Sequence, residues 1–78
     1  MMEKEFDKKK VAVEFGLFVR EAREKKGLLQ AEVAEMLGIS RVYYTYIESG
    51  SRDIYFSLGL KICAVLDLNI NDFAKRMK

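Results

Sequence analysis

The chain has 78 residues, of which half are hydrophobic and a third are charged, with a formal net charge of +2, one cysteine, no histidine and no proline. This length suits a single domain with a marginal core, and the composition excludes an intrachain disulfide and a zinc site of cysteine and histidine ligands. No apolar run approaches the ~20 residues of a membrane span, and MMEKEFDKKK lacks the apolar segment of a signal peptide, so we expect a cytoplasmic protein.

The chain opens on a charged N-terminal segment, residues 1–10, that we expect to be frayed or to extend the first helix. From Val11 to Lys26 apolar residues recur at helical spacing, which predicts a helix with one apolar face. Lysines in its last turn complement the negative end of its dipole, and Gly27 ends it. The residues predicted to face inward are Ala12, Phe15, Val19 and Ala22, with Phe18 beside them.

The next stretch, residues 30–47, has the pattern of two short helices joined by a tight turn. Gly38 suits the left-handed conformation that ends a helix. Ser40 follows as an N-cap candidate, because its hydroxyl can accept a bond from a backbone N–H of the next helix. A sharp corner between the two helices is therefore expected. The inward face of the first of them carries Val33, Ala34 and Leu37.

The second of these helices, residues 40–48, separates two kinds of side chain. Tyr44 and Ile47 lie three positions apart and share an inward face with Ile39 of the turn. The opposite face projects outward, where we expect it to meet a partner molecule. That outward face carries Arg41, Val42, Thr45, Tyr46 and Ser49.

A turn-rich link follows and leads into a helix over about residues 56–66. Gly50 suits a left-handed C-cap, and Asp53 is a candidate cap for the new helix. Cys63 is expected to be a small core residue, since nothing nearby in the sequence would activate its thiol. The candidate inward residues are Phe56, Leu60, Cys63 and Leu66.

A last helix is predicted after Asn69, which is an N-cap candidate with Asp72 in the first turn behind it. Its apolar stripe comprises Ile70, Phe73, Ala74 and Met77. Because a chain this short has a marginal core, apolar positions in surplus favour self-association. We expect a homodimer whose interface includes Ile70, Phe73 and Met77.

The spacing within residues 30–47 resembles the helix-turn-helix of phage repressor and Cro-type regulators, the xenobiotic-response-element-like family. Counted from Gln30, the fifth place holds a small residue, the ninth a glycine, and the fourth, eighth, tenth, fifteenth and eighteenth places hold apolar residues. The flanking stretches FVREAREKKGLLQ and IESGSRDIYFSLGLKICAVLDLNINDF resemble the rest of that family's domain. SRVYYTYIESGSRDI is also similar to restriction–modification controller proteins. The resemblance implies an all-α, five-helix repressor-like DNA-binding domain over residues 11–78.

The resemblance also implies roles for single residues. The family pairs an arginine late in the first helix with a glutamate that ends the third, which implies an ion pair between Arg23 and Glu48. It places the glutamine corresponding to Gln30 against the DNA backbone and the loop corresponding to Arg52 along phosphates. The residues Lys8–Lys10 could form a further arm on phosphates, as in some relatives. For each of these, a solvated surface side chain is the alternative.

Five positions depart from the family pattern, among them Ile54, where the family often has proline, and Tyr55, where it often has a serine cap. Leu29 stands where the family commonly has a serine or threonine N-cap, which removes a bond worth about 1 kcal/mol. Tyr44 stands where isoleucine or valine is preferred, and Gly59 where leucine is preferred. We expect the Tyr44 ring to fill the space that a leucine at position 59 would take, with its hydroxyl at a polar partner or solvent.

The sequence therefore predicts a sequence-specific DNA-binding transcriptional regulator. Helix 40–48 would enter the major groove of double-stranded DNA, and a homodimer would cover two half-sites. Arg41 is the expected reader of guanine, while the methyl groups of Val42 and Thr45 suit a thymine methyl. Tyr43 and Tyr46 either offer hydroxyls to DNA or pack within the domain. The candidate DNA-binding residues are Gln30, Ser40, Arg41, Val42, Tyr43, Thr45, Tyr46, Ser49 and Arg52.

The alternative function is a protein-interaction module of the same fold, antitoxin-like or cytoskeleton-binding. The aromatic, weakly charged outer face of helix 40–48 favours it. Catalysis is disfavoured, because the sequence has no histidine, no phosphate-cradling glycine loop and no carboxylate pair held in a cleft. We expect no cofactor, no metal and no small-molecule ligand.

Overall fold

A computed structural model describes residues 7–78, and this part of the chain forms five α-helices and no strands. The prediction of an all-α, five-helix fold is confirmed. Within the described residues, none of the helices has the length and apolar character needed to cross a membrane. The helices are α1 (Lys8–Lys25), α2 (Gln30–Leu37), α3 (Arg41–Ser49), α4 (Phe56–Leu66) and α5 (Ile70–Arg76).

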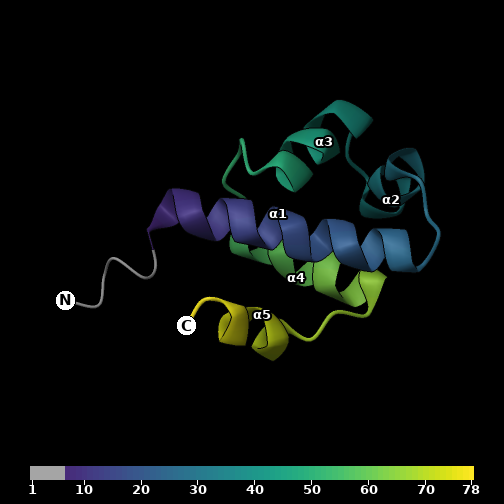
Figure 1. The fold of residues 1–78 in the computed structure, drawn as a ribbon. Helices are drawn as coiled ribbons and strands as arrows, with labels where there is room; N and C mark the ends of the chain where they lie inside the picture. Colours follow the sequence, from purple (N-terminus) through teal and green to yellow (C-terminus); the bar gives the residue numbers. More distant parts are fainter. Residues whose placement is uncertain (1–6) are drawn as a thin grey trace.

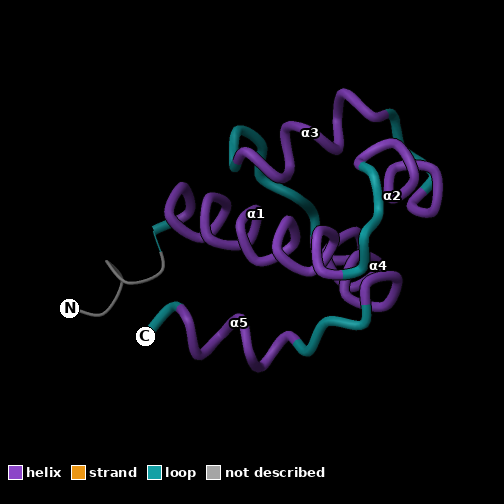
Figure 2. Tube along the Cα trace, turned by 45° about the vertical axis from the view of Figure 1, so that its right-hand side comes forward, coloured by secondary structure: helices purple, strands orange, loops and turns teal. Residues whose placement is uncertain are grey.

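Helix α1 is the longest element, and the other helices are arranged around it. Figures 1 and 2 show α2 and α3 on one side of α1 and α5 on the other, with α4 alongside. α1 contacts α3, α4 and α5, while α2 contacts α3 and α4. The corner formed by α2 and α3 is therefore supported from behind by α1 and α4.

The N-terminal boundary of α1 lies earlier than the apolar spacing predicts. The helix includes Lys8–Lys10, so these lysines extend it, which is one of the two expectations for the N-terminal segment. Residues 1–6 of that segment lie outside the described residues. The backbone N–H of Val11 donates to the Asp7 carbonyl oxygen at 2.9 Å, which adds a helical bond at the start of the apolar face.

The core draws side chains from every helix. Val19 of α1, Val33 of α2, Tyr44 of α3 and Ile62 of α4 have no exposed surface. Helix α5 joins this core through Phe73, whose ring contacts two phenylalanine rings of α1. The ring centroid of Phe73 lies 5.2 Å from that of Phe15 and 5.5 Å from that of Phe18.

The burial of α5 corrects the reasoning behind the expected dimer residues. Phe73 is 9% exposed and Met77 is 5% exposed within a single chain. They complete the core of their own chain, so they are not surplus apolar positions. Ile70, at 46% exposed, is the member of the expected set that faces solvent.

Helix α4 presents a different face to the core from the one its spacing predicts. Phe56 and Leu60 are expected inward, but they are 79% and 48% exposed. The prediction is right for Cys63 and Leu66, which are buried, and wrong for Phe56 and Leu60. It fails there because FSLGLKICAVL is apolar on nearly every side, so that spacing alone does not select the buried face. Contacts with α1 and α2 select it. The buried residues of α4 are Leu58, Ile62, Cys63 and Leu66.

Capping fixes the ends of the helices on either side of the corner. Gly38 has a φ of +74°, a left-handed value that suits glycine, and the Ser40 hydroxyl accepts a bond from the Tyr43 N–H at 3.0 Å. Leu29 has no capping side chain, but the Glu32 carboxylate accepts a bond from its N–H at 2.7 Å. One half of a capping box therefore remains at the start of α2.

The last two helices begin differently from each other. The Asn69 side chain accepts a bond from the Asn71 N–H at 2.9 Å and so caps α5 as expected. Helix α4 has Tyr55 at its N-cap position and no side-chain cap, so the expectation for Asp53 is wrong. Asp53 instead lies 3.7 Å from the Lys8 ammonium group of α1.

The expected packing between Tyr44 and Gly59 is also wrong. A Cβ at position 59 would lie 3.6 Å from Ile54 Cδ1, and no atom of Tyr44 would be within 4 Å of it. The Tyr44 ring is fully buried, and its hydroxyl contacts Glu48. Its place in the core therefore does not depend on the missing side chain at position 59.

We predict that Gly59→Ala raises the free energy of unfolding by about 1 kcal/mol at low protein concentration. Alanine has the higher helix propensity, and its methyl group would make an ordinary contact with Ile54. Denaturant melts measure the change. Gly16, also helical, is the matched control: a Cβ there would lie 2.6 Å from the Ile47 carbonyl oxygen. Gly16→Ala should therefore destabilise by about 1–3 kcal/mol, and a destabilised Gly59→Ala would contradict this view of α4.

Candidate nucleic-acid interface

Helix α3 has a buried face and an exposed face. Tyr44, Ile47 and Glu48 are buried against the rest of the domain. Arg41 is exposed in the first turn, and Val42 and Tyr46 are 54% and 40% exposed. A short helix therefore offers a basic, an aliphatic and an aromatic side chain on one outward surface.

The Glu48 carboxylate joins α1, α2 and α3 at the end of that helix. Arg23 donates to it twice, from Nε to Oε2 at 2.6 Å and from Nη2 to Oε1 at 3.2 Å. The Tyr44 hydroxyl donates to Oε2 at 2.5 Å, and Gln30 Nε2 donates to Oε1 at 3.0 Å. The pair of Arg23 and Glu48 that the family resemblance implies is thus present, within a larger network.

Burial makes this network electrostatically demanding. Among the described residues, Glu48 is the one charged side chain that is buried, at 7% exposed. Burial by itself would raise the pKa of Glu48, but hydrogen bonds from Arg23, Tyr44 and Gln30 outweigh it and hold that pKa below its ordinary value. The hydrogen bond to Glu48 raises the pKa of Arg23, so both partners stay ionised.

Tyr44 contributes to the network as a neutral donor. Burial, followed by its hydrogen bond to the Glu48 carboxylate, raises the pKa of Tyr44 well above its ordinary value. The phenol therefore keeps its proton and donates it to the carboxylate. The sequence indicates an inward tyrosine here, and the contact with Glu48 four residues later explains why a phenol is accommodated in place of an aliphatic side chain.

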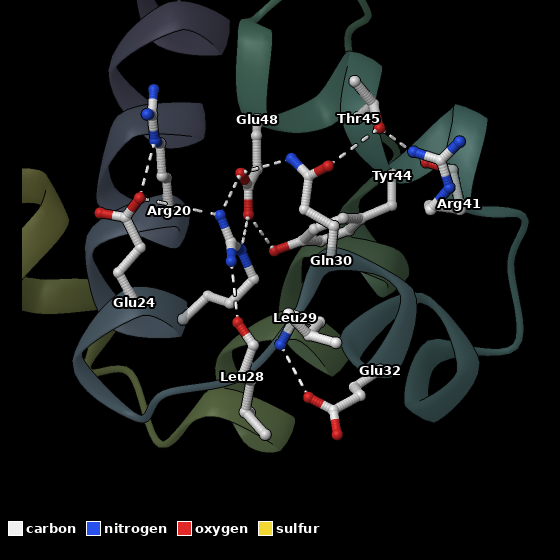
Figure 3. A network of polar contacts seen from close by, with 11 residues as sticks. Arg20, Glu24, Leu28, Leu29, Gln30, Glu32, Arg41, Tyr44, Thr45 and Glu48 are labelled. Carbon is white, nitrogen blue, oxygen red and sulfur yellow. Dashed lines mark hydrogen bonds and ion pairs between the residues drawn. The ribbon is translucent and has the colours of Figure 1, made fainter.

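Gln30 connects the buried network to the outward side of α3. Figure 3 shows its side chain between Glu48 and Thr45. Gln30 Oε1 lies 3.4 Å from the Thr45 hydroxyl, which also lies 2.9 Å from the Arg41 carbonyl oxygen. A hydroxyl has one proton, so Thr45 donates to one of these oxygens at a time. Gln30 and Thr45 are both half-buried and therefore constrain each other at the edge of the exposed face.

The loop after α3 carries a contact that sequence reasoning missed. The Arg52 guanidinium lies over the Tyr46 ring, 5.2 Å from its centroid, within reach of a cation–π interaction. Gly50 allows the chain to turn back after α3, because its φ is +75° and a Cβ there would lie only 2.6 Å from the Val13 Cα atom. Because six positions separate the two side chains across a turn, helical spacing gives no sign of the pairing.

The remaining candidate residues differ in how far they are engaged within the chain. Ser40 caps α3, and the Ser49 hydroxyl donates to the Tyr46 carbonyl oxygen at 3.0 Å and lies 2.6 Å from the Ser51 hydroxyl. Tyr43 is half-buried and packs against the core. The candidate residues that are exposed and whose side chains take no part in these hydrogen bonds are therefore Arg41, Val42, Tyr46 and Arg52.

A comparison with known families matches the part of the chain that contains the α2–α3 corner and the helices packed behind it. A family model described as Helix-turn-helix matches residues 19–73, from the second half of α1 into α5. No curated protein matches the chain. The matched span contains α2, α3 and α4 whole, together with every residue of the Glu48 network.

We predict that Tyr44→Phe lowers the free energy of unfolding by about 1.5–3 kcal/mol, the usual cost of a hydrogen bond to a charged group. The ring stays, so no cavity forms, but the Glu48 carboxylate loses one of its donors. Tyr43→Phe is the matched control, because Tyr43 is half-buried on the same helix and outside the network. Denaturant melts that show equal losses for the two variants would contradict the role given to Tyr44.

The Glu48 network also predicts how the free energy of unfolding depends on pH. Because the pKa of Glu48 lies below its ordinary value of 4.5, its stabilising contribution is fully present above about pH 4.5 and is lost as the pH falls through the lower folded value. The free energy of unfolding should therefore fall below about pH 4.5. Tyr44→Phe removes a donor that lowers this pKa, so its fall should be shallower than that of the wild type in melts across the acidic range. If the free energies of unfolding of the wild type and Tyr44→Phe fell in parallel with pH, Tyr44 would not stabilise the Glu48 carboxylate.

Proposed function

We propose that this chain, which belongs to the helix-turn-helix family of the Cro/C1 type, is a cytoplasmic, sequence-specific DNA-binding transcriptional regulator. Its helix α3 is the element proposed to enter the major groove. The observation that carries this proposal is the contrast between the two faces of α3. Its inner face is tied to α1 and α2 through Glu48, while its outer face presents Arg41, Val42 and Tyr46. A rigid helix with an exposed, chemically mixed face suits readout of base edges.

Arg41 is the proposed reader of sequence. It occupies the first turn of α3, and the first residues of a recognition helix are those that contact base edges in this mode of docking. Its guanidinium can donate two parallel hydrogen bonds to O6 and N7 of guanine. Val42 beside it offers methyl groups to a thymine methyl, and Thr45 one turn later offers another.

The proposed contacts to the DNA backbone flank this reader. Arg52 follows α3 on a loop and is held over the Tyr46 ring, so a phosphate would find a partly ordered cation there. Gln30 begins α2, where the positive helix end favours a phosphate, although its side chain already bridges Glu48 and Thr45. Ser40, Tyr43 and Ser49 complete the proposed contact surface as further hydroxyl donors.

We propose that the protein binds as a homodimer on two half-sites about 34 Å apart, since one α3 covers only a few base pairs. SRVYYTYIESGSRDI is similar to restriction–modification controllers, so control of a restriction–modification gene pair is the specific system to test. The alternative function, protein recognition by α3, is favoured by the exposure of Val42 and Tyr46. Sequence-dependent binding to duplex DNA distinguishes the two.

We predict that Arg41→Ala weakens binding to the specific site by about 1–3 kcal/mol and relaxes the preference at one base pair, because it removes a bidentate guanine contact. Arg52→Ala should weaken binding to all sequences alike and lower the salt dependence, because a phosphate contact carries no sequence information. Arg20→Ala, which removes an exposed arginine of α1, is the control for lost charge. Mobility shifts on matched duplexes measure all three variants. If Arg41→Ala discriminated between duplex sequences as well as the wild type does, Arg41 would not be the residue that reads the bases.

A further inference from the structure

An exposed apolar surface lies at the start of α4 and is separate from the outward face of α3. We call it the α4 face, and it consists of Tyr55, Phe56, Leu60 and Ile70, which are 61%, 79%, 48% and 46% exposed. Soluble monomers seldom expose several large apolar side chains together, and such patches usually mark a contact with another molecule. The DNA-binding proposal gives these residues no role.

A hollow lies next to the α4 face. Its volume is ≈220 Å³, and it is lined by residues of α1, the end of α3, the link between α3 and α4, α4 itself and α5. The four residues of the α4 face are all among them. Most of its lining is apolar, while Arg52 and Asp53 bring opposite charges to its edge. The α4 face thus combines a projecting ring, Phe56, with a neighbouring apolar recess.

Gly59 keeps that recess open. It lies in the middle of α4 with an ordinary helical φ, and a Cβ there would touch only Ile54 Cδ1 at 3.6 Å. Neither backbone conformation nor crowding requires glycine at this position, although glycine weakens a helix relative to other residues. A larger side chain at position 59 would extend into the hollow, since both Gly59 and Ile54 line it.

We infer that the α4 face is the homodimer interface, with Phe56 of each protomer inserted into the hollow beside Gly59 of the other. A ring and a recess on one surface are self-complementary under a two-fold axis, and that axis is also the symmetry of a two-half-site operator. The inference deepens the proposed function, on which it rests for the need for two copies. It places the interface on Phe56, Leu60 and Ile70, in contrast to the buried Phe73 and Met77.

A second copy fits this surface better than a small apolar ligand does. A ligand that only fills the ≈220 Å³ hollow would touch the sides of Phe56 and Ile70 that line it and would leave the rest of these exposed side chains in water. A two-fold partner would cover the hollow and both side chains at once. Aromatic side chains bury about 150–250 Å² each, so the α4 face can supply a large part of the ~800 Å² per partner of a standard interface.

Sedimentation equilibrium of the full chain without DNA tests the inference. We expect the wild type to dimerise, and both Phe56→Ser and Gly59→Leu to weaken the dimer by about tenfold or more. Phe56→Ser removes the projecting ring, and Gly59→Leu fills the recess from within its own chain. Met36→Ser is the matched control: Met36 is 47% exposed on α2, close to the exposure of Leu60, and its loss should leave the association unchanged.

Circular dichroism keeps the result interpretable, since both variants should retain the helical signal of the wild type. Gly59→Leu in particular adds a good helix former, so loss of the dimer cannot be ascribed to unfolding of α4. A monomeric wild type, or a dimer equally stable in all the variants, would overturn the inference. Because no DNA is present, failure here leaves DNA binding by α3 standing, and a dimer that binds no DNA leaves this interface standing.

Discussion

The buried Glu48 carboxylate is the interaction on which the arrangement of the helix-turn-helix depends. A charge taken out of water is costly unless it is paired and hydrogen-bonded, and here each oxygen accepts two bonds. The donors come from α1, α2 and α3, so one carboxylate sets how three helices meet (Figure 3). Arg23 additionally donates to the Leu28 carbonyl oxygen at 2.8 Å, which brings the α1–α2 loop into the same cluster. The outward face of α3 takes its direction from this fixed inner side.

The corner of the fold was the part most open to prediction from sequence, because local chemistry determines it. Gly38 and Ser40 each have a conformational or hydrogen-bonding preference that works over a few residues, and both are found in the predicted roles. Asn69 caps α5 for the same reason. The separation of Arg41 and Val42 from the inward Tyr44 follows equally directly, since helical period alone sorts the faces of a short amphipathic helix.

Features that depend on packing between helices could not be read in this way. α4 is apolar nearly all round, so its sequence gives no preference between an inward Phe56 and an inward Leu58, and tertiary contact decides. The stripe of α5 looks like an interface until the Phe15 and Phe18 rings of α1 are found to cover Phe73. The hollow beside the α4 face is a three-dimensional gap among five segments and leaves no trace in the spacing of any one of them.

The central claim is that a rigidly held α3 reads the sequence of double-stranded DNA, and a binding selection from random duplexes tests it most directly. We predict enrichment of a two-fold symmetric site, with half-sites about one helical turn apart and a guanine in each half that Arg41→Ala no longer selects. A pool that shows no sequence enrichment after repeated rounds, obtained with protein that retains its helical circular dichroism, would contradict it.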